Sequence, residues 1–333
     1  MLTDLAIRDR KDIFSGVGVA KRIRGEAVEK DWWVTQVLRI LFSSKYKDNI
    51  VFKGGTSLSK GWHLIERFSE DVDIAINREF LGFSGELTRT QISDKLRRAS
   101  CSFVRTELRE AVEMGLLNLG IPQSMFSVVV DMTPVTTTDP EKVFIQYESV
   151  FESPLSTYVK PKVIIEAGAR SMFDPSSRIT IRSFVSDVLS DSSIADPGFE
   201  VKATPAERTF LEKIFLLHEE FHKEGLVRTE RMSRHLYDIE RMMDTPIGQA
   251  INDENLYKGI IEHRRRFIGL KGFDYNTLMP KTIAIVPPEE VQTEWARDYR
   301  AMQESMIFGD SLSFTELLSR IGELNDRLHG LPF

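Results

Sequence analysis

The stretch "VFKGGTSLSKGWHLIERFSEDVDIAI", residues 51–76, decides the fold of this chain. A short apolar run ends in a pair of glycines, and three acidic residues follow within residues 70–73. Polar and apolar residues then alternate, which is the period of a half-buried β-strand. The alternation places Asp71 and Asp73 on one face of that strand and Glu70 on the other. We therefore interpret Glu70 as an edge residue and the two aspartates as a functional pair.

The spacing of Asp71 and Asp73 suits a metal ion. Side chains two residues apart on a strand project from the same face, roughly 6.5–7 Å apart, so both carboxylates can converge on one or two hard cations. Hard cations such as Mg²⁺ take oxygen ligands and retain waters and substrate phosphates. Aspartate is also poorly suited to a strand interior. A metal site is therefore favoured over the alternative, in which two solvent-facing aspartates simply end a strand.

The paired glycines indicate where a phosphate binds. They precede a helix predicted over residues 56–68, and the N–H groups and positive dipole end at the start of a helix suit an anion. The spacing differs from a Walker loop, because Ser59 precedes Lys60 where that loop requires Gly-Lys-Ser/Thr. The segment thus predicts a nucleoside triphosphate (NTP) site that joins metal-binding aspartates to a phosphate-binding turn. Four residues form this predicted turn: Gly54, Gly55, Thr56 and Ser57.

Bulk composition excludes several classes of protein. The chain has 333 residues, 41% of them hydrophobic and 28% charged, as in an ordinary globular protein. A formal net charge of −6 gives no general attraction to nucleic acid or membranes, so an RNA contact needs a local basic cluster such as residues 262–267. The one cysteine, Cys101, excludes an intramolecular disulfide and a cysteine-rich zinc module. With no apolar leader and no run of about 20 apolar residues, we expect a cytoplasmic protein.

The pattern of predicted elements changes near the middle of the chain. Strands and helices alternate at first, which predicts an α+β domain over residues 1–200. Apolar residues then recur at helical spacing, which predicts a helical domain over residues 201–333. Thr204, Pro205 and Glu207 have the spacing of a capping box at the first helix of this domain. Strands are predicted at 49–53, 70–76, 125–132 and 158–170, and helices at 27–44, 56–68, 88–120, 204–224, 233–243, 257–268, 289–307 and 314–329.

A rival signal lies in "HEEFH", residues 218–222, which matches the H-E-x-x-H pattern of zinc hydrolases. In that pattern His218 and His222 bind zinc one helical turn apart, and Glu219 acts as the base. Zinc hydrolases of this type need neither a glycine turn nor an acidic strand. A zinc hydrolase is therefore kept only as an alternative function.

The combination of "GGTSLSK" (54–60), a short helix and "RFSEDVDI" (67–74) resembles the polymerase-β-like nucleotidyltransferase fold. More narrowly, the chain resembles the AbiEii/AbiGii family, the nucleotidyltransferase-like toxins of bacterial toxin–antitoxin and phage-defence pairs. Further blocks of this pattern occur in the same order along most of the chain: "EKDWWVTQVL" (29–38), "RTFLEKIFLLH" (208–218), "SRHLYDI" (233–239) and "WARDYRAMQESMIF" (295–308). The resemblance implies a core built on a mixed sheet, followed by a helical domain that completes the active site.

The resemblance also implies roles for residues outside the opening stretch. Lys213 would contact the nucleotide and stabilise charge on the leaving group. Arg234 would hold phosphate, and Asp238 would accept a proton from the attacking hydroxyl or orient a partner. The third metal ligand would be Glu166, with Asp131 as the competing candidate.

Each of these residues has a purely structural alternative. Lys213 has the spacing to pair with Glu212 or Glu207 along its own helix. Arg234 and Asp238 are four residues apart and suit an ordinary helix salt bridge. The two candidate carboxylates equally suit exposed acids at strand ends.

The family resemblance implies an enzyme that transfers a nucleotidyl group from an NTP to an acceptor hydroxyl and releases pyrophosphate. Mg²⁺ (or Mn²⁺) would be the metal, the 3′ end of tRNA the acceptor, and a cognate antitoxin protein a partner. Three alternatives stay open at this point. They are transfer to a protein or small molecule, NTP binding without turnover, and the zinc hydrolase.

Overall fold

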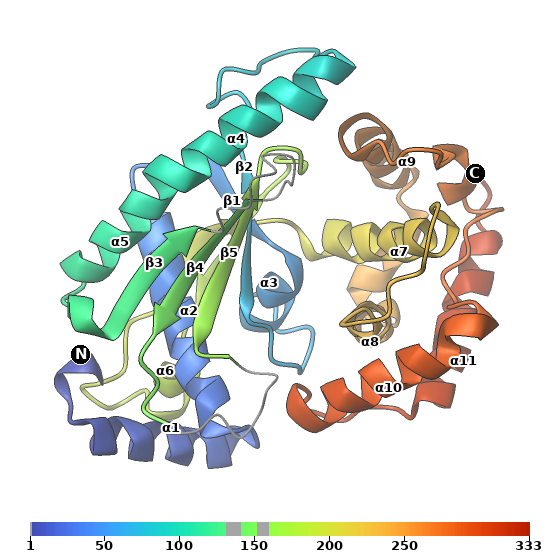
Figure 1. Ribbon diagram of the computed structural model, residues 1–333. Helices are drawn as coiled ribbons and strands as arrows, with labels where there is room; N and C mark the ends of the chain where they lie inside the picture. The colour runs from blue at the N-terminus through green and yellow to red at the C-terminus, as the bar shows by residue number, and fades with distance from the viewer. Residues whose placement is uncertain (1, 131–140, 152–159) are drawn as a thin grey trace. The chain divides into compact units, whose positions relative to one another are not determined.

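The computed structural model describes residues 2–130, 141–151 and 160–333. These residues form two compact units (Figure 1). The first unit contains Met1–Trp62 and Phe68–Thr204, and the second contains His63–Arg67 and Pro205–Phe333. The second unit thus combines the C-terminal part of the chain with a short segment that lies in sequence between α3 (Gly54–Lys60) and β2 (Asp71–Ile76).

The described part of the first unit forms a seven-stranded mixed sheet in the order β3-β4-β5-β2-β1-β7-β6. Pairing is parallel between β2 and β5 and between β1 and β7, and it is antiparallel between the other neighbours. This mixed sheet with its helices confirms the predicted α+β class. The remaining strands are β1 (Ile50–Lys53), β3 (Phe126–Val130), β4 (Glu141–Tyr147), β5 (Lys162–Gly168), β6 (Ser177–Ile181) and β7 (Phe199–Ala203).

Helices pack against this sheet (Figure 1). α2 contacts β2, β5 and β7, while α4 and α5 contact β5 and β3. Trp33 of α2 stacks on Tyr147 of β4, with ring centroids 4.9 Å apart. The helix predicted over 88–120 is confirmed as continuous helical turns from Gln91 to Asn118. The elements are α1 (Ile7–Lys21), α2 (Gly25–Ser43), η2 (Gln91–Leu96), α4 (Arg97–Phe103), η3 (Val104–Leu108), α5 (Arg109–Asn118) and α6 (Phe184–Val188).

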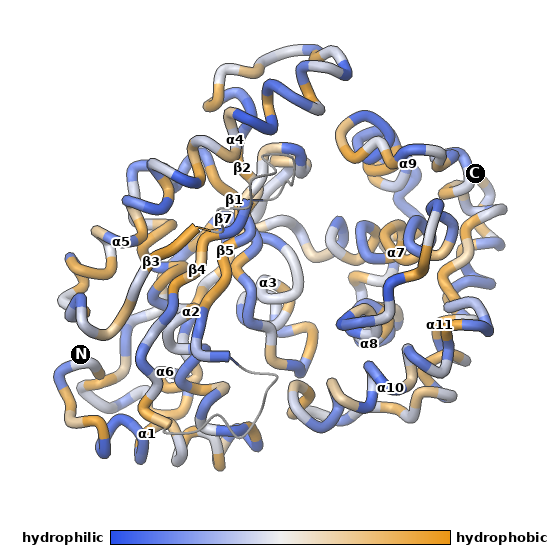
Figure 2. Tube along the Cα trace, in the orientation of Figure 1, coloured by the Kyte–Doolittle hydropathy of each residue, from blue (hydrophilic) through white to orange (hydrophobic). Residues whose placement is uncertain are grey.

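The central strands bury one face and leave the other partly open. Val72 and Ile74 of β2 and Ile165 of β5 are completely buried. Asp71 and Asp73 alternate with them and are half-buried on the opposite face. Figure 2 shows the hydrophobic residues that run along the strands and the facing helices. The predicted alternation in β2 is thus confirmed, and it places the two aspartates together on the half-buried face.

The helix predicted over 56–68 is too long. α3 ends at Lys60, and Gly61 is its C-cap. His63 then adopts a left-handed backbone with φ 54°, which stops helical hydrogen bonding. The chain from Gly61 onward therefore forms a non-helical connection to β2.

The capping box predicted at Thr204 is wrong. The Thr204 N–H donates to the carbonyl of Phe52, 2.8 Å away, so this residue continues the sheet instead of capping a helix. Pro205 takes the N-cap position of α7 in an extended conformation. Strands β4, β6 and β7 were also not among the predicted elements.

The second unit is built of helices around an apolar core. α8 and α11 coincide with the helices predicted over 233–243 and 314–329. Trp295 and Tyr299 of α10 are buried in the core. Among the described residues, no helix is long and apolar enough to cross a membrane. The helices are α7 (Ala206–His222), α8 (Ser233–Met243), α9 (Glu254–His263), α10 (Glu289–Ser305) and α11 (Phe314–His329).

The segment His63–Arg67 is fixed within the second unit by backbone and side-chain contacts. The Glu66 carbonyl accepts a hydrogen bond from the Phe308 N–H at 3.0 Å, and Arg67 forms a β-bridge with Ile307. The Glu66 carboxylate also pairs with Arg241 of α8 at 3.1 Å. The connection between α3 and β2 is thus a structural part of the helical unit.

Candidate active site

A row of charged residues crosses four strands of the sheet. Asp73 of β2 lies opposite Lys53 of β1 on one side and Glu166 of β5 on the other. Glu166 in turn lies opposite Lys142 of β4. Directly opposed residues of neighbouring strands project from the same face of a sheet. Asp71, two residues before Asp73, projects from this face as well.

Glu166 forms an ion pair with Lys142, with 2.6 Å between Oε1 and Nζ. The Glu166 side chain is 25% exposed and the Lys142 side chain 45% exposed. Burial disfavours the ammonium charge, yet the bond to Glu166 and the nearby charges of Asp71 and Asp73 raise the pKa of Lys142 above its usual value. Glu166 therefore lies on the strand beside the aspartates, with its charge compensated by a lysine, and its role as a metal ligand stays a prediction.

The residues that the structure describes contain no group of three or more His, Cys, Asp or Glu side chains placed to hold a metal ion. Asp71 and Asp73 supply two carboxylates, and proteins commonly bind Mg²⁺ through one or two carboxylates plus waters and substrate phosphates. The donor set therefore fits a hard divalent cation that arrives with a phosphate ligand. Asp131, the competing third carboxylate, lies outside the described residues.

The glycine turn lies against the acidic strand. Gly54 has φ +79°, in the left-handed region that favours glycine. A Cβ atom at this position would lie 2.0 Å from Oδ2 of Asp73, which is a severe clash. Both the backbone conformation and the approach of the Asp73 carboxylate thus require glycine here.

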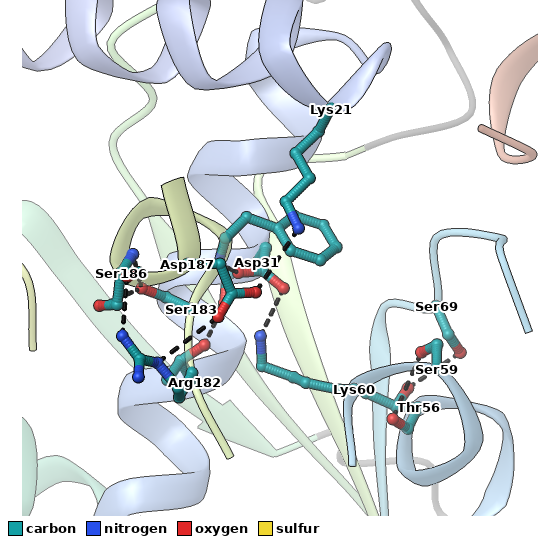
Figure 3. Close-up of polar contacts among 12 residues, drawn as sticks. Lys21, Asp31, Thr56, Ser59, Lys60, Ser69, Arg182, Ser183, Ser186 and Asp187 are labelled. Atoms are coloured by element: carbon teal, nitrogen blue, oxygen red, sulfur yellow. Dashed lines mark hydrogen bonds and ion pairs between the residues drawn. The ribbon is translucent and has the colours of Figure 1, made fainter. Parts of the chain in front are cut away.

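The two hydroxyl groups of the turn bind the protein itself. Thr56 Oγ1 donates to the backbone carbonyl of Asp71 at 2.5 Å and lies 2.9 Å from the Ser69 hydroxyl (Figure 3). Ser57 Oγ donates to the Gly54 carbonyl at 2.8 Å. Both side chains are buried. These hydroxyls fix the turn and the start of β2, so any phosphate contact of the turn is expected from its backbone N–H groups.

Two buried ion pairs attach α2 to the end of α3 and to the start of β2. Asp31 binds Lys60, the last residue of α3, with 2.5 Å between Oδ1 and Nζ, and its other oxygen accepts from the backbone N–H of Phe184 at 2.7 Å (Figure 3). Lys30 pairs with Glu70, the residue before β2. The prediction that Glu70 is an edge residue is therefore wrong, because this side chain is buried against Lys30.

These ion pairs position the site, and sequence reasoning missed them. Burial raises the pKa of the Asp31 carboxyl, while the charge of Lys60 opposes that shift. Glu29, the preceding residue, accepts from the Ser149 hydroxyl at 2.6 Å and from the Val150 N–H at 2.9 Å. The signal was present as three consecutive charges directly before the apolar residues Trp32, Trp33 and Val34, at "EKDWWV".

A second buried cluster lies in the helical unit around Asp238 of α8. The Asp238 carboxylate receives two hydrogen bonds from Arg67, at 2.6 and 2.8 Å, and pairs with Lys213 of α7 at 2.9 Å. All three side chains are buried. Lys213 thus pairs with Asp238, and within the described residues no ion pair joins either of them to the same-helix partner considered as the structural alternative.

The electrostatics of this cluster favour an orienting role for Asp238. Burial disfavours its charge, but Arg67 and Lys213 lower the pKa of its carboxyl. A carboxylate held by two cations has little affinity for a further proton. Burial lowers the pKa of Lys213, with Asp238 opposing the shift. Arg234 is half-buried on α8, the helix of Asp238. Burial is the main cause that lowers the pKa of His235, and the charge of Arg234 contributes to the same shift.

A family model described as "Nucleotidyl transferase AbiEii toxin, Type IV TA system" matches residues 36–320. The chain belongs to the AbiEii family. The matched span contains the glycine turn, the acidic strand and the Asp238 cluster. It confirms the resemblance and the nucleotidyltransferase-like core. No curated protein gives a significant match to this chain.

The H-E-x-x-H pattern lies inside the span that matches the AbiEii family, and its side chains have structural partners. Nδ1 of His218 accepts from the Ala284 N–H at 2.9 Å, and Nε2 lies 2.9 Å from the Thr277 hydroxyl. Glu219 forms a bidentate pair with Arg264 of the basic run 262–267. The side chains of His218 and Glu219 thus attach α7 to neighbouring segments, and Arg264 of the basic run is the partner of Glu219.

His218 makes the stability of the second unit sensitive to acid. Burial, aided by the stacked His222, lowers the pKa of His218 to about 4. In the unfolded chain the His218 imidazole takes up its proton near pH 6.5, whereas in the folded protein it does so only near pH 4. The free energy of unfolding that this group contributes above pH 6.5 is therefore lost as the pH falls toward 4. We expect a loss of about 2 kcal/mol between pH 7.5 and pH 5 from this group. Urea unfolding at both pH values, followed by circular dichroism, measures it.

The matched variant for this prediction is His218→Asn, which cannot titrate. Its loss between the two pH values should be smaller than that of the wild-type protein by the same amount. Equal losses in the two proteins would contradict the assignment of the acid sensitivity to His218.

Proposed function

We propose that this protein is a divalent-cation-dependent nucleotidyltransferase toxin. It transfers a nucleotidyl group from an NTP to an acceptor hydroxyl and releases pyrophosphate. The approach of Gly54 to the Asp73 carboxylate carries this proposal, because it brings a phosphate-binding turn and a metal-binding acid within contact distance. Membership of a family of nucleotidyl transferase toxins supports the same reaction.

Asp71 and Asp73 are the proposed ligands of Mg²⁺ or Mn²⁺, and Glu166 is the proposed third carboxylate once it separates from Lys142. When bound, the cation would activate the acceptor hydroxyl and stabilise charge on the departing pyrophosphate. The backbone of Gly54, Gly55, Thr56 and Ser57 would hold the phosphates, with Thr56 keeping Asp71 in place through its hydroxyl.

In the second unit, Lys213 and Arg234 are the proposed nucleotide-binding residues. Lys213 is a buried ammonium whose position is fixed by Asp238, so it would meet a phosphate with little loss of side-chain entropy. Asp238 is proposed to orient Lys213, in keeping with its two ion pairs.

The proposed acceptor is the 3′ end of tRNA, and this step rests on the family resemblance. A type IV toxin–antitoxin family implies an antitoxin encoded with the toxin, and we propose a role for the pair in phage defence. Because tRNA and NTPs are cytoplasmic, we propose that the protein acts there.

Incubation of the protein with each α-labelled NTP in turn, together with total RNA, tests the proposed reaction. Label that enters tRNA, and that is lost in the Asp71→Ala variant, supports it. Label on protein or on a small molecule identifies the other acceptor classes. Tight NTP binding without any transfer of label would show a binding protein instead of an enzyme.

A further inference from the structure

The ammonium group of Lys142 binds the carboxylate that is proposed as the third metal ligand. Its partner Glu166 stands directly opposite Asp73, and the bond between Nζ and Oε1 is 2.6 Å long. Asp71 and Asp73 are also near enough for their charges to act on Lys142. One lysine thus faces the three acids that the proposed reaction assigns to a divalent cation.

The partial exposure of this pair makes it exchangeable. The Lys142 side chain is 45% exposed and that of Glu166 25% exposed. An ion pair in contact with water contributes about 0–1 kcal/mol, so a divalent cation can displace it. The buried pair of Lys30 with Glu70 is different, since both side chains are nearly inaccessible to solvent.

We propose that the Lys142 ammonium competes with the metal ion for the Glu166 carboxylate. This inference rests on the function proposed above. A cation that reaches Asp71 and Asp73 gains the Glu166 carboxylate only after that carboxylate leaves the lysine. The lysine also repels the cation, because it carries the same sign of charge. The protein alone therefore binds a divalent cation weakly, and the cation is taken up together with the NTP, whose phosphates supply further oxygen ligands.

The competition predicts the metal affinity of variants. We expect Lys142→Met to bind Mn²⁺ about tenfold or more tightly than the wild-type protein in the absence of nucleotide, because the Glu166 carboxylate is released to the cation and a nearby positive charge is removed. Mn²⁺ titration followed by electron paramagnetic resonance measures this without any catalytic turnover. In the background of Glu166→Gln, the same lysine substitution should raise Mn²⁺ affinity much less, because only the charge repulsion is then relieved.

The control for the change in net charge is Lys202→Met. Lys202 lies on β7 of the same sheet and pairs with Asp48 at 3.1 Å. This variant should leave Mn²⁺ affinity within about twofold of the wild-type value, since the charge it removes is screened by solvent. Thermal melting of each variant verifies that the fold is retained.

Unchanged or weaker Mn²⁺ binding by Lys142→Met would overturn the inference. An equally large gain in the background of Glu166→Gln would overturn it as well, because the competition would then not be for Glu166. Failure of the proposed function gives a different result. In that case Mn²⁺ binding would be insensitive to Asp71→Ala, or no label would be transferred from any NTP.

Discussion

Replacing Asp73 with asparagine is expected to lower the rate of nucleotidyl transfer roughly 10³-fold while the fold is retained. Asparagine has nearly the size of aspartate, so the close approach to Gly54 is preserved and only the negative charge is lost. The lost charge lies between the glycine turn and Glu166, where the proposed cation needs an anionic oxygen ligand. Single-turnover incorporation of labelled nucleotide into the acceptor measures the rate.

A control acid on the same sheet separates this effect from a general change of charge. Glu200 of β7 is 62% exposed and pairs with Arg178 at 3.2 Å. Glu200→Gln removes the same unit of charge, and we expect a rate within about twofold of the wild-type value because a surface pair contributes little. An Asp73→Asn protein that keeps more than about a tenth of the wild-type rate would exclude the aspartate pair as the metal site.

The parts of the site that the sequence predicted are those encoded by local patterns. Alternation in residues 70–76 predicted β2, and it correctly directed Asp71 and Asp73 to one face. The paired glycines predicted a turn, and the structure adds the reason that Gly54 is required, which is the Asp73 carboxylate. These features depend on neighbours in the chain, so a short stretch suffices to predict them.

Contacts between distant segments were not predictable in the same way. Lys142 and Glu166 meet only because β4 and β5 pair in one register. The alternation of Val143, Ile145 and Tyr147 in "EKVFIQY" could have indicated β4, and with it the lysine. The contact of Arg67 with Asp238 was hidden by the helix predicted over 56–68, since that prediction placed Arg67 on a helix of the first domain.

The buried charges on α2 show a further limit of pattern reading. Apolar periodicity identified the helix correctly, but it treats every charged residue as belonging to the solvent side. Lys30 and Asp31 are buried instead, because Glu70 of the connection before β2 and Lys60 of α3 pair with them. Only the tertiary structure shows that these charges are paired, although three charges in a row beside Trp32 and Trp33 indicate that partners exist.

Asp238→Asn is expected to destabilise the second unit by about 3–5 kcal/mol. The Asp238 side chain is completely buried between Arg67 and Lys213, so neutralising it leaves two buried cations without their counter-ion. Urea unfolding followed by circular dichroism measures the loss. Adding Lys213→Met should recover part of it, since one of the two buried charges is then removed.

Asp244 offers a matched comparison in the same unit. It also lies between two cations, Arg320 and Arg327, but its side chain is 51% exposed. Water can solvate the arginines when this carboxylate is lost, so Asp244→Asn should cost less than about 1 kcal/mol. Similar losses for the two variants would show that burial is not what makes the Asp238 cluster costly to disrupt. The expected large loss for Asp238→Asn also means that transfer assays of this variant report a damaged fold.

The orienting role of Asp238 is therefore tested through Lys213→Arg. This variant keeps a positive charge beside the Asp238 carboxylate but changes the geometry of the cationic group that the carboxylate holds.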